Sequence, residues 1–182
     1  MRSPMGGGST PGRSAATVVS ISPQEYVSSS MSANITPERP DSADARALIA
    51  ELEAQLEPLY PRESRHGFSV EQLLAEAVAF FLIRESGIPA GCGGVKLVGS
   101  EYAEVKRMYV RPQFRSAGLA KLMLKHLTDY AQGQGMGLLR LETGIHQRAA
   151  IGLYESAGFR RIPPFGEYQE DPLSRCYEKR LR

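Results

Sequence analysis

The sequence has little of what defines several common classes of protein. Of its 182 residues only two are cysteines, Cys92 and Cys176, and they form no Cys-x-x-Cys pair. We therefore expect no disulfide framework, and reduced thiols in a cytoplasmic protein are the default. The three histidines form no His-Glu-x-x-His pattern and no cluster with cysteine, so we expect no metal site. No apolar run approaches the ~20 residues that span a bilayer, and no membrane association is expected.

Neither sign of charge is in excess. Lysine and arginine number 22 and aspartate and glutamate 20, which gives a net charge of +2. A protein that wraps nucleic acid usually carries a strongly basic stripe, and an acidic disordered chain carries a large negative charge. Both classes are disfavoured, and we expect no nucleic-acid partner. The 42% hydrophobic content and the length instead predict one globular domain that folds without disulfides or metal.

Residues 1 to about 30 differ in composition from the rest. Residues 5–12 are linker-like, serine and threonine are frequent, and the first acidic residue is Glu25. We interpret residues 1–30 as a disordered tail or as a non-native extension ahead of a start at Met31. A transit peptide is a weaker alternative, because basic residues are few. Residues 31–182 are expected to form a single domain.

Helical and strand patterns alternate along this domain. Leu48, Ile49 and Leu52 recur at helical spacing, and residues 78–98 read as two strands joined by a tight turn. The patterns predict helices over residues 41–56, 70–77, 117–132 and 147–157, and strands over residues 78–84, 90–98, 103–110, 138–143 and 174–180. This order predicts a mixed sheet flanked by helices, of the α/β or α+β class.

One junction between a strand and a helix has the features of an anion site. The strand over 103–110 ends before Pro112, and the next helix begins close to Gly118. Unpaired N–H groups and the positive end of the helix dipole meet in the loop between them. Gly118 permits a close approach of the backbone, Ala120 keeps the next turn small, and Arg115 adds a positive charge. An ordinary strand-to-helix turn is the alternative.

Two motifs resemble those of the GNAT family of N-acetyltransferases. Residues 115–120, RSAGLA, resemble the family's motif A, R/Q-x-x-G-x-G/A. Residues 147–159, QRAAIGLYESAGF, resemble its motif B, N-x-x-A-x-x-L-Y-x-x-x-G-F. Residues 163–179 resemble the corresponding segment of a subgroup of small, mostly uncharacterised bacterial members. The resemblance covers nearly the whole domain and implies a GNAT fold, a mixed central sheet of about six to seven strands flanked by about four helices.

The resemblance also implies that acetyl-CoA is the cosubstrate. In this family the backbone N–H groups of motif A hold the pyrophosphate, and the main chain of the preceding strand pairs with the pantetheine arm. Gln147 stands where the family usually has an asparagine that contacts the cofactor, and Tyr154 is a further cofactor contact. The residues that match the pyrophosphate-binding loop are Arg115, Ser116, Ala117, Gly118, Leu119 and Ala120. Those that match the strand beside the pantetheine arm are Met108, Tyr109 and Val110.

The same resemblance assigns chemical roles. Tyr154 matches the tyrosine that protonates the departing CoA thiolate as general acid. Glu104 matches a glutamate that serves as general base, and period two places it on one strand face with Lys106 and Met108. A strand N–H near Met108 would stabilise the oxyanion. A structural pair between Glu104 and Lys106 is the alternative, and Glu142 competes for the role of base.

We therefore expect an N-acetyltransferase that moves acetyl from acetyl-CoA to a primary amine by direct attack in a ternary complex. The acceptor is a small-molecule or peptide amine, in a pocket built from the first helices, residues 60–67 and residues 163–173. His66, Lys106 and Arg107 are candidates to contact it, the last two through an acidic group. A non-catalytic acyl-CoA-binding sensor or interaction module and transfer of another acyl group are the alternatives. The family often dimerises, so a homodimer is also an expectation.

Overall fold

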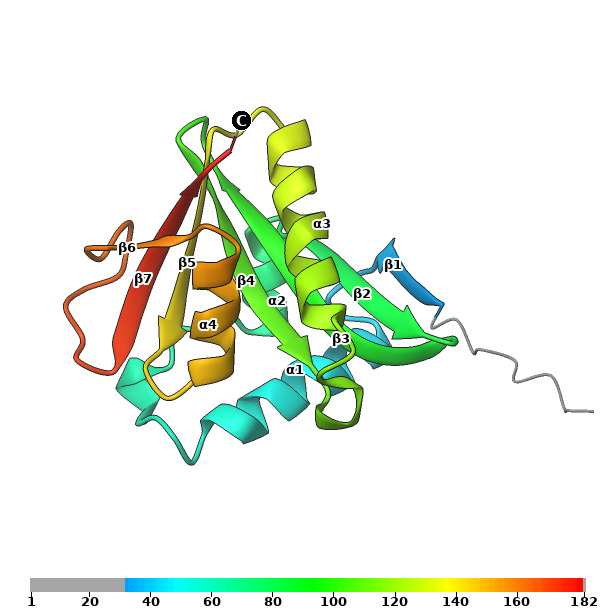
Figure 1. Ribbon diagram of the computed structural model, residues 1–182. Helices are drawn as coiled ribbons and strands as arrows, with labels where there is room; N and C mark the ends of the chain where they lie inside the picture. The colour runs from blue at the N-terminus through cyan, green and yellow to red at the C-terminus, as the bar shows by residue number, and fades with distance from the viewer. Residues whose placement is uncertain (1–31, 182) are drawn as a thin grey trace, which may run out of the picture. The chain divides into compact units, whose positions relative to one another are not determined.

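A single seven-stranded sheet runs through residues 32–181, the part of the chain that the computed structural model describes (Figure 1). The expectations for residues 1–30 fall outside the described residues. The strands are β1 (Ala33–Pro37), β2 (Ala79–Glu85), β3 (Ile88–Val98), β4 (Tyr102–Val110), β5 (Leu138–Gly144), β6 (Arg160–Ile162) and β7 (Ser174–Arg180). The helices are α1 (Ala43–Leu56), α2 (Val70–Ala75), α3 (Leu119–Gly133) and α4 (Arg148–Ser156), with 3₁₀ turns η1 (Arg62–Ser64) and η2 (Pro112–Phe114).

The sheet order is β1-β2-β3-β4-β5-β7-β6, and β4 with β5 is the parallel pair among antiparallel neighbours. This is the mixed sheet flanked by helices that the sequence predicts, so the predicted fold class is confirmed. None of the described helices is long and apolar enough to cross a bilayer.

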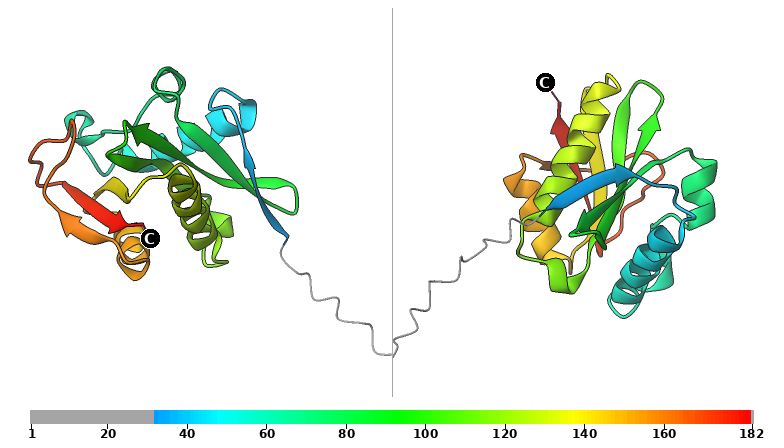
Figure 2. Two further views of the ribbon diagram at one scale, coloured as in Figure 1. Left: turned by 90° about the horizontal axis from the view of Figure 1, so that it is seen from above. Right: turned by 90° about the vertical axis from the view of Figure 1, so that its right-hand side faces the viewer.

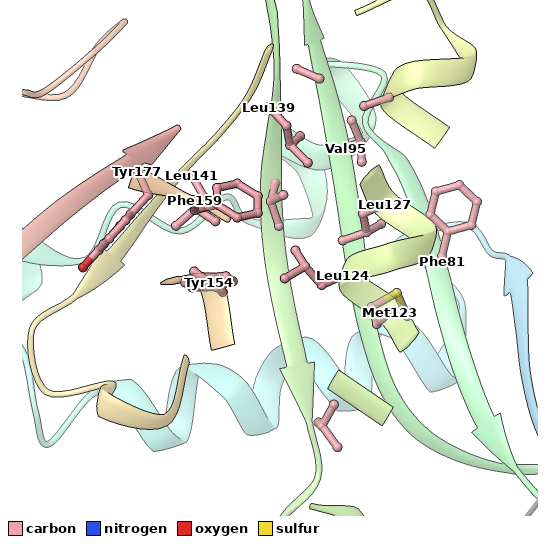
Figure 3. Close-up of a cluster of buried hydrophobic side chains, with 14 of the residues drawn as sticks. Phe81, Val95, Met123, Leu124, Leu127, Leu139, Leu141, Tyr154, Phe159 and Tyr177 are labelled. Atoms are coloured by element: carbon pink, nitrogen blue, oxygen red, sulfur yellow. The ribbon is translucent and has the colours of Figure 1, made fainter. Parts of the chain in front are cut away.

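Helices cover both faces of the sheet, with α3 and α4 on one face and α1 and α2 on the other (Figures 1 and 2). Alternation along β2 serves both layers, since Phe81 and Ile83 pack in the cluster that includes α3, whereas Phe80 and Leu82 pack with α1 and α2. Figure 3 shows the α3 side of this core, where Met123 and its neighbours fill the space above the sheet. The central strands are therefore fixed from both sides.

The parallel strands β4 and β5 diverge after a short contact. They pair only at Ala103 with Leu139 and at Glu104 with Arg140. Beyond these pairs β4 continues to Val110 and β5 to Gly144 without further pairing between them (Figure 1). Main-chain groups along the facing edges thus have no partner strand within the described residues, and a wedge opens in the middle of the sheet.

A β-bulge lies on β4 beside this wedge. Cys92 pairs with Tyr109 and Gly94 with Lys106, so two β4 residues, Arg107 and Met108, stand opposite one residue of β3. Arg107 has φ +53°, a left-handed conformation that costs a non-glycine residue roughly 1–3 kcal/mol. The Cys92 thiol donates to the carbonyl oxygen of Arg107 at 3.3 Å, and the guanidinium of Arg107 pairs with a carboxylate of α1. The surrounding structure holds the strained residue in place.

The start of α3 and strand β6 are among the details that differ from the sequence prediction. Helix α3 begins at Leu119, not at Ala117, because Gly118 is its N-cap and has φ +79°. Strand β6 is only three residues long and pairs with β7 at the sheet edge. So short a segment has no periodicity to detect, which is why the pattern from residue 158 to 173 gives no strand.

Candidate functional site

A cavity of about 100 Å³ lies where β4 and β5 diverge, and α1 and residues 60–68 close it from one side. Of the residues predicted for the cofactor and the acid, Met108, Gln147 and Tyr154 line it. The predicted acceptor contacts His66, Lys106 and Arg107 line it as well. Glu104 lies instead in an adjoining groove of about 560 Å³, which shares Lys106 and Tyr168 with the cavity. The wedge therefore brings the predicted acid to the cavity itself and the predicted base to its neighbour.

Tyr154 projects from α4 into the buried core beside the cavity. Figure 3 shows it near Leu141 and Phe159, and its ring centroid lies 5.9 Å from that of Phe159. Burial raises the pKa of Tyr154 to about 12, and the charge of Glu142 adds to the shift. A phenol with a raised pKa keeps its proton at neutral pH, so Tyr154 can serve as a proton donor.

Glu104 is buried in a compact group of polar side chains. The ammonium of Lys106 donates to Glu104 Oε1 at 2.6 Å, and the Tyr168 hydroxyl donates to the same oxygen at 2.5 Å. The Lys106 ammonium also lies 4.2 Å from the ring centroid of Phe68. Glu104 does pair with Lys106, as the alternative interpretation expected, but neither side chain is more than a tenth exposed. A pair with a purely structural role on a solvated strand face would be exposed, whereas this pair is buried beside the groove.

Glu142, the competing carboxylate, lines the cavity from β5. Burial raises its pKa, although the Ser174 hydroxyl donates to Glu142 Oε1 at 2.6 Å and opposes the shift. Arg140 pairs with Glu178, and Arg107 pairs with a carboxylate of α1, so neither arginine neutralises Glu142. A raised pKa makes this carboxylate a stronger base when ionised, and the geometry keeps it in competition with Glu104.

The loop before α3 presents backbone N–H groups at one end of the wedge. Ser116 and Gly118 have φ of +66° and +79°, and no side chain caps the start of α3. Backbone in which left-handed residues recur forms a concave nest of N–H groups that binds anions. The Arg115 side chain braces this loop, because it donates to the Val110 carbonyl at 2.9 Å and to Gln55 Oε1 at 2.5 Å. Within the predicted anion loop the Arg115 N–H already donates to the Pro112 carbonyl at 3.2 Å, whereas the N–H groups at the start of α3 have no side-chain cap.

The substitution Gly118→Ala tests this loop. A side chain in the left-handed region costs roughly 1–2 kcal/mol, so the loop would relax and its N–H groups would turn. We expect acetyl-CoA affinity to fall by about tenfold in calorimetric titration, the factor that such a cost implies. Gly152→Ala is the matched control, since Gly152 lies within α4 and a Cβ there meets open space. Equal affinities for the two variants would contradict an anion site at Gly118.

Both cysteines are buried and free of any disulfide. Burial raises the pKa of Cys92 to about 12 and that of Cys176 to about 11. Because the thiolate is the nucleophile, neither residue is suited to carry an acyl group at neutral pH. This chemistry favours direct transfer over a covalent intermediate on cysteine.

Tyr60 and Tyr168 lie in the ranges expected to build the acceptor pocket, but the sequence predicts no specific contact for either. Tyr168 completes the Glu104 group. Tyr60 accepts a hydrogen bond from the backbone N–H of His146 at 2.9 Å and closes the cavity beside the start of α4. The sequence signal for both is weak, because each acts across a long separation in the chain.

Comparison with known proteins agrees with this geometry. The family model described as Acetyltransferase (GNAT) family matches residues 45–159. The IAA acetyltransferase of Azospirillum brasilense is 40% identical over 135 residues, which cover 74% of this chain and 88% of that protein. A crystal structure from Klebsiella pneumoniae, provisionally assigned as an acyl-CoA N-acyltransferase, has a TM-score of 0.74 and 38% identity, and covers 83% of this chain and 99% of that one.

A more distant structure shares the fold and holds a ligand. The PaiA N-acetyltransferase of Thermoplasma acidophilum, in complex with coenzyme A, has a TM-score of 0.65 at 20% identity. The match covers 83% of this chain and all of that one, 100%. The seven-stranded sheet and the family match together confirm the resemblance seen in the two motifs. The chain therefore belongs to the GNAT family of acetyltransferases.

Proposed function

We propose that the protein transfers an acetyl group from acetyl-CoA to a primary amine by direct attack within a ternary complex. The observation that carries the proposal is the wedge between β4 and β5, which has uncapped N–H groups at one end and buried Tyr154 at its side. The coenzyme A held by the PaiA structure supports an acyl-CoA cosubstrate. Membership of the family supports acetyltransferase chemistry in general. The roles of individual residues in this chain are part of the proposal.

The cosubstrate would bind along the wedge. The backbone from Arg115 to Ala120 would hold the pyrophosphate, because uncapped N–H groups at a helix N-terminus favour an anion. The unpaired edge from Met108 to Val110 would hydrogen-bond the pantetheine arm as an additional strand does. Gln147 lies at the N-cap position of α4 and lines the cavity, so its amide can contact the same ligand.

The chemistry requires a base, an oxyanion donor and an acid. The amine nitrogen attacks the thioester carbonyl carbon, the C–N bond forms and the C–S bond breaks. A base removes the proton of the attacking amine, and Tyr154 gives a proton to the departing thiolate. An N–H of the bulge at Arg107 and Met108 would stabilise the oxyanion, since a bulge leaves its extra residue out of the strand ladder.

Glu104 is the base that we favour. Its carboxylate is held by Lys106 and by the Tyr168 hydroxyl, both of which bond to Oε1 and leave Oε2 for a proton carried by amine or water. It borders the groove that opens next to the cavity, on the side where an acceptor would enter. Glu142, which lines the cavity itself, remains the competitor for this role.

Release of free thiol from acetyl-CoA tests this function. A panel of primary amines, from small metabolites to peptides with free N-termini, is offered with acetyl-CoA, and thiol formation is followed together with the mass of the amine. We expect thiol and N-acetylated amine to appear in equal amounts for at least one class. Tight binding of acetyl-CoA with no thiol release for any amine would favour the acyl-CoA-binding sensor. Faster release from another acyl-CoA would change the acyl group.

A further inference from the structure

Arg65 stands in the wall between the cavity and the groove, directly after η1. It lines both spaces, and its side chain is 22% exposed. Its Nε is buried and has no hydrogen-bond partner among the residues that the structure describes. A buried donor without a partner is costly, and a polar ligand relieves that cost. Arg65 thus has unused hydrogen-bonding capacity at the place where an acceptor would bind.

The charges around Arg65 are not balanced. Its nearest carboxylate is that of Glu53, whose Oε2 is 3.7 Å from the Arg65 guanidinium. Glu53 already pairs closely with Arg107, so two guanidinium groups share one carboxylate. Lys106, the other cation that β4 places beside the cavity, forms an ion pair with Glu104. Lys106 and Arg107, the sequence-predicted contacts for an acidic acceptor, are both in close ion pairs within the protein, whereas Arg65 has only the longer 3.7 Å contact with the shared Glu53 carboxylate.

The loop that carries Arg65 is held firmly. The Arg107 guanidinium donates to the Phe68 carbonyl at 2.5 Å and lies so close to Gly67 that a Cβ there would collide with it. Ser69 then opens α2 with a capping box, in which its hydroxyl accepts from the Gln72 N–H at 3.2 Å. A guanidinium on a fixed loop loses little conformational entropy when it binds a ligand.

We propose that Arg65 binds a carboxylate of the acceptor, so that the acceptor class is an amine that also carries a carboxylate, such as an amino acid. This inference rests on the proposed function and names the substrate class of the same site. A guanidinium matches a carboxylate with two parallel hydrogen bonds. For Arg65 this requires the side chain to turn so that its buried, unpartnered Nε faces the ligand beside a terminal nitrogen. With its carboxylate on Arg65, between the cavity and the groove, the acceptor would place its amine near the wedge.

The carboxylates around the cavity do not cancel this preference. Glu53 and Glu104 are each paired with a cation. Glu142 accepts from Ser174, and burial raises its pKa and lowers its tendency to carry charge. His66, which lines the same two spaces, lies 3.7 Å from Asp171. Arg65, whose contact with the shared Glu53 carboxylate is 3.7 Å long, is therefore the least closely paired of these cations and the one that an incoming anion would meet.

The test compares amino acids with their carboxamides in wild type and in Arg65→Gln. We expect wild type to prefer the acids, and Arg65→Gln to raise KM for the acids by about 10- to 100-fold, as loss of a charged hydrogen-bond pair implies, with KM for the amides within about twofold. Arg62→Gln is the matched control, because Arg62 lies on the same loop and lines neither space. Arg65→Lys should recover part of the affinity, since it keeps the charge but loses the fork.

A binding experiment makes the result independent of turnover. Calorimetric titration of the same acids and amides into protein saturated with coenzyme A should show the acid preference in wild type and its loss in Arg65→Gln. Equal binding of acids and amides by wild type, or an equal loss for both in the variant, would overturn the assignment. Thiol release with neutral amines only would overturn the role of Arg65 and leave the acetyltransferase proposal standing. Absence of thiol release with every amine contradicts the acetyltransferase instead.

Discussion

Replacing Tyr154 with phenylalanine is expected to lower kcat by about 100-fold or more, in line with the contribution of a general acid. The substitution removes only the hydroxyl, and the ring keeps its contact with Phe159 in the core. Acetyl-CoA affinity should stay within about twofold, because a group that acts on the leaving thiolate stabilises the transition state rather than the ground state. Steady-state kinetics and equilibrium titration of acetyl-CoA measure the two quantities separately.

A second buried tyrosine provides the control for Tyr154. Tyr177 belongs to the same cluster, and its hydroxyl donates to Glu155 at 3.1 Å away from the cavity (Figure 3). Tyr177→Phe should leave kcat nearly unchanged. The pKa of Tyr154, about 12, further predicts that alkaline pH does not remove this proton donor below about pH 10. Unimpaired turnover in Tyr154→Phe would remove the assignment of the acid.

The second large effect is expected for Glu104→Gln, which should lower kcat by about 100-fold through loss of the base. Glu142→Gln is the matched comparison, since it removes the competing carboxylate and its amide can still accept from Ser174. A larger loss of kcat in Glu142→Gln than in Glu104→Gln would reverse the two roles. Rates are compared at saturating acetyl-CoA, so that binding of the cosubstrate does not enter.

Stability must be separated from catalysis at Glu104. Removing its charge leaves the Lys106 ammonium buried without a counter-ion, which typically destabilises a protein by about 3–5 kcal/mol. The double substitution Glu104→Gln with Lys106→Met removes both charges and should recover most of the lost Tm. We expect it to recover little of kcat. Recovery of kcat along with Tm would make Glu104 a structural residue and contradict its role as base.

Much of the fold can be predicted from the sequence because the patterns that indicate helices and strands are local. Period-two alternation and helical spacing each arise within a dozen residues, and they place β4, β5, α3 and α4 close to their observed bounds. The two motifs lie at the junctions of these elements, so their order along the chain already places the uncapped start of α3 and Tyr154 beside one wedge. The family resemblance could therefore be tested directly against the sheet.

The parts that escaped prediction depend on distant pairings. Glu104 and Tyr168 are 64 residues apart, and nothing near either residue indicates that they meet. The bulge at Arg107 exists because β3 offers one residue to two of β4, whereas the β4 sequence alone reads as a regular strand. The proposed role of Arg65 depends on the ion pair between Glu53 and Arg107, which the sequence does not predict. Such features are set by tertiary structure, and periodicity carries no trace of them.

We propose that acetyl passes directly from acetyl-CoA to an amine. Rapid mixing of the protein with acetyl-CoA, first without and then with a reactive amine, tests it most directly through thiol release and the intact mass of the protein. Direct transfer predicts no thiol and no acetylated protein before the amine arrives, then one thiol for each N-acetylated product. A burst of thiol equal to the protein concentration without amine, with acetyl retained on the chain, would contradict it.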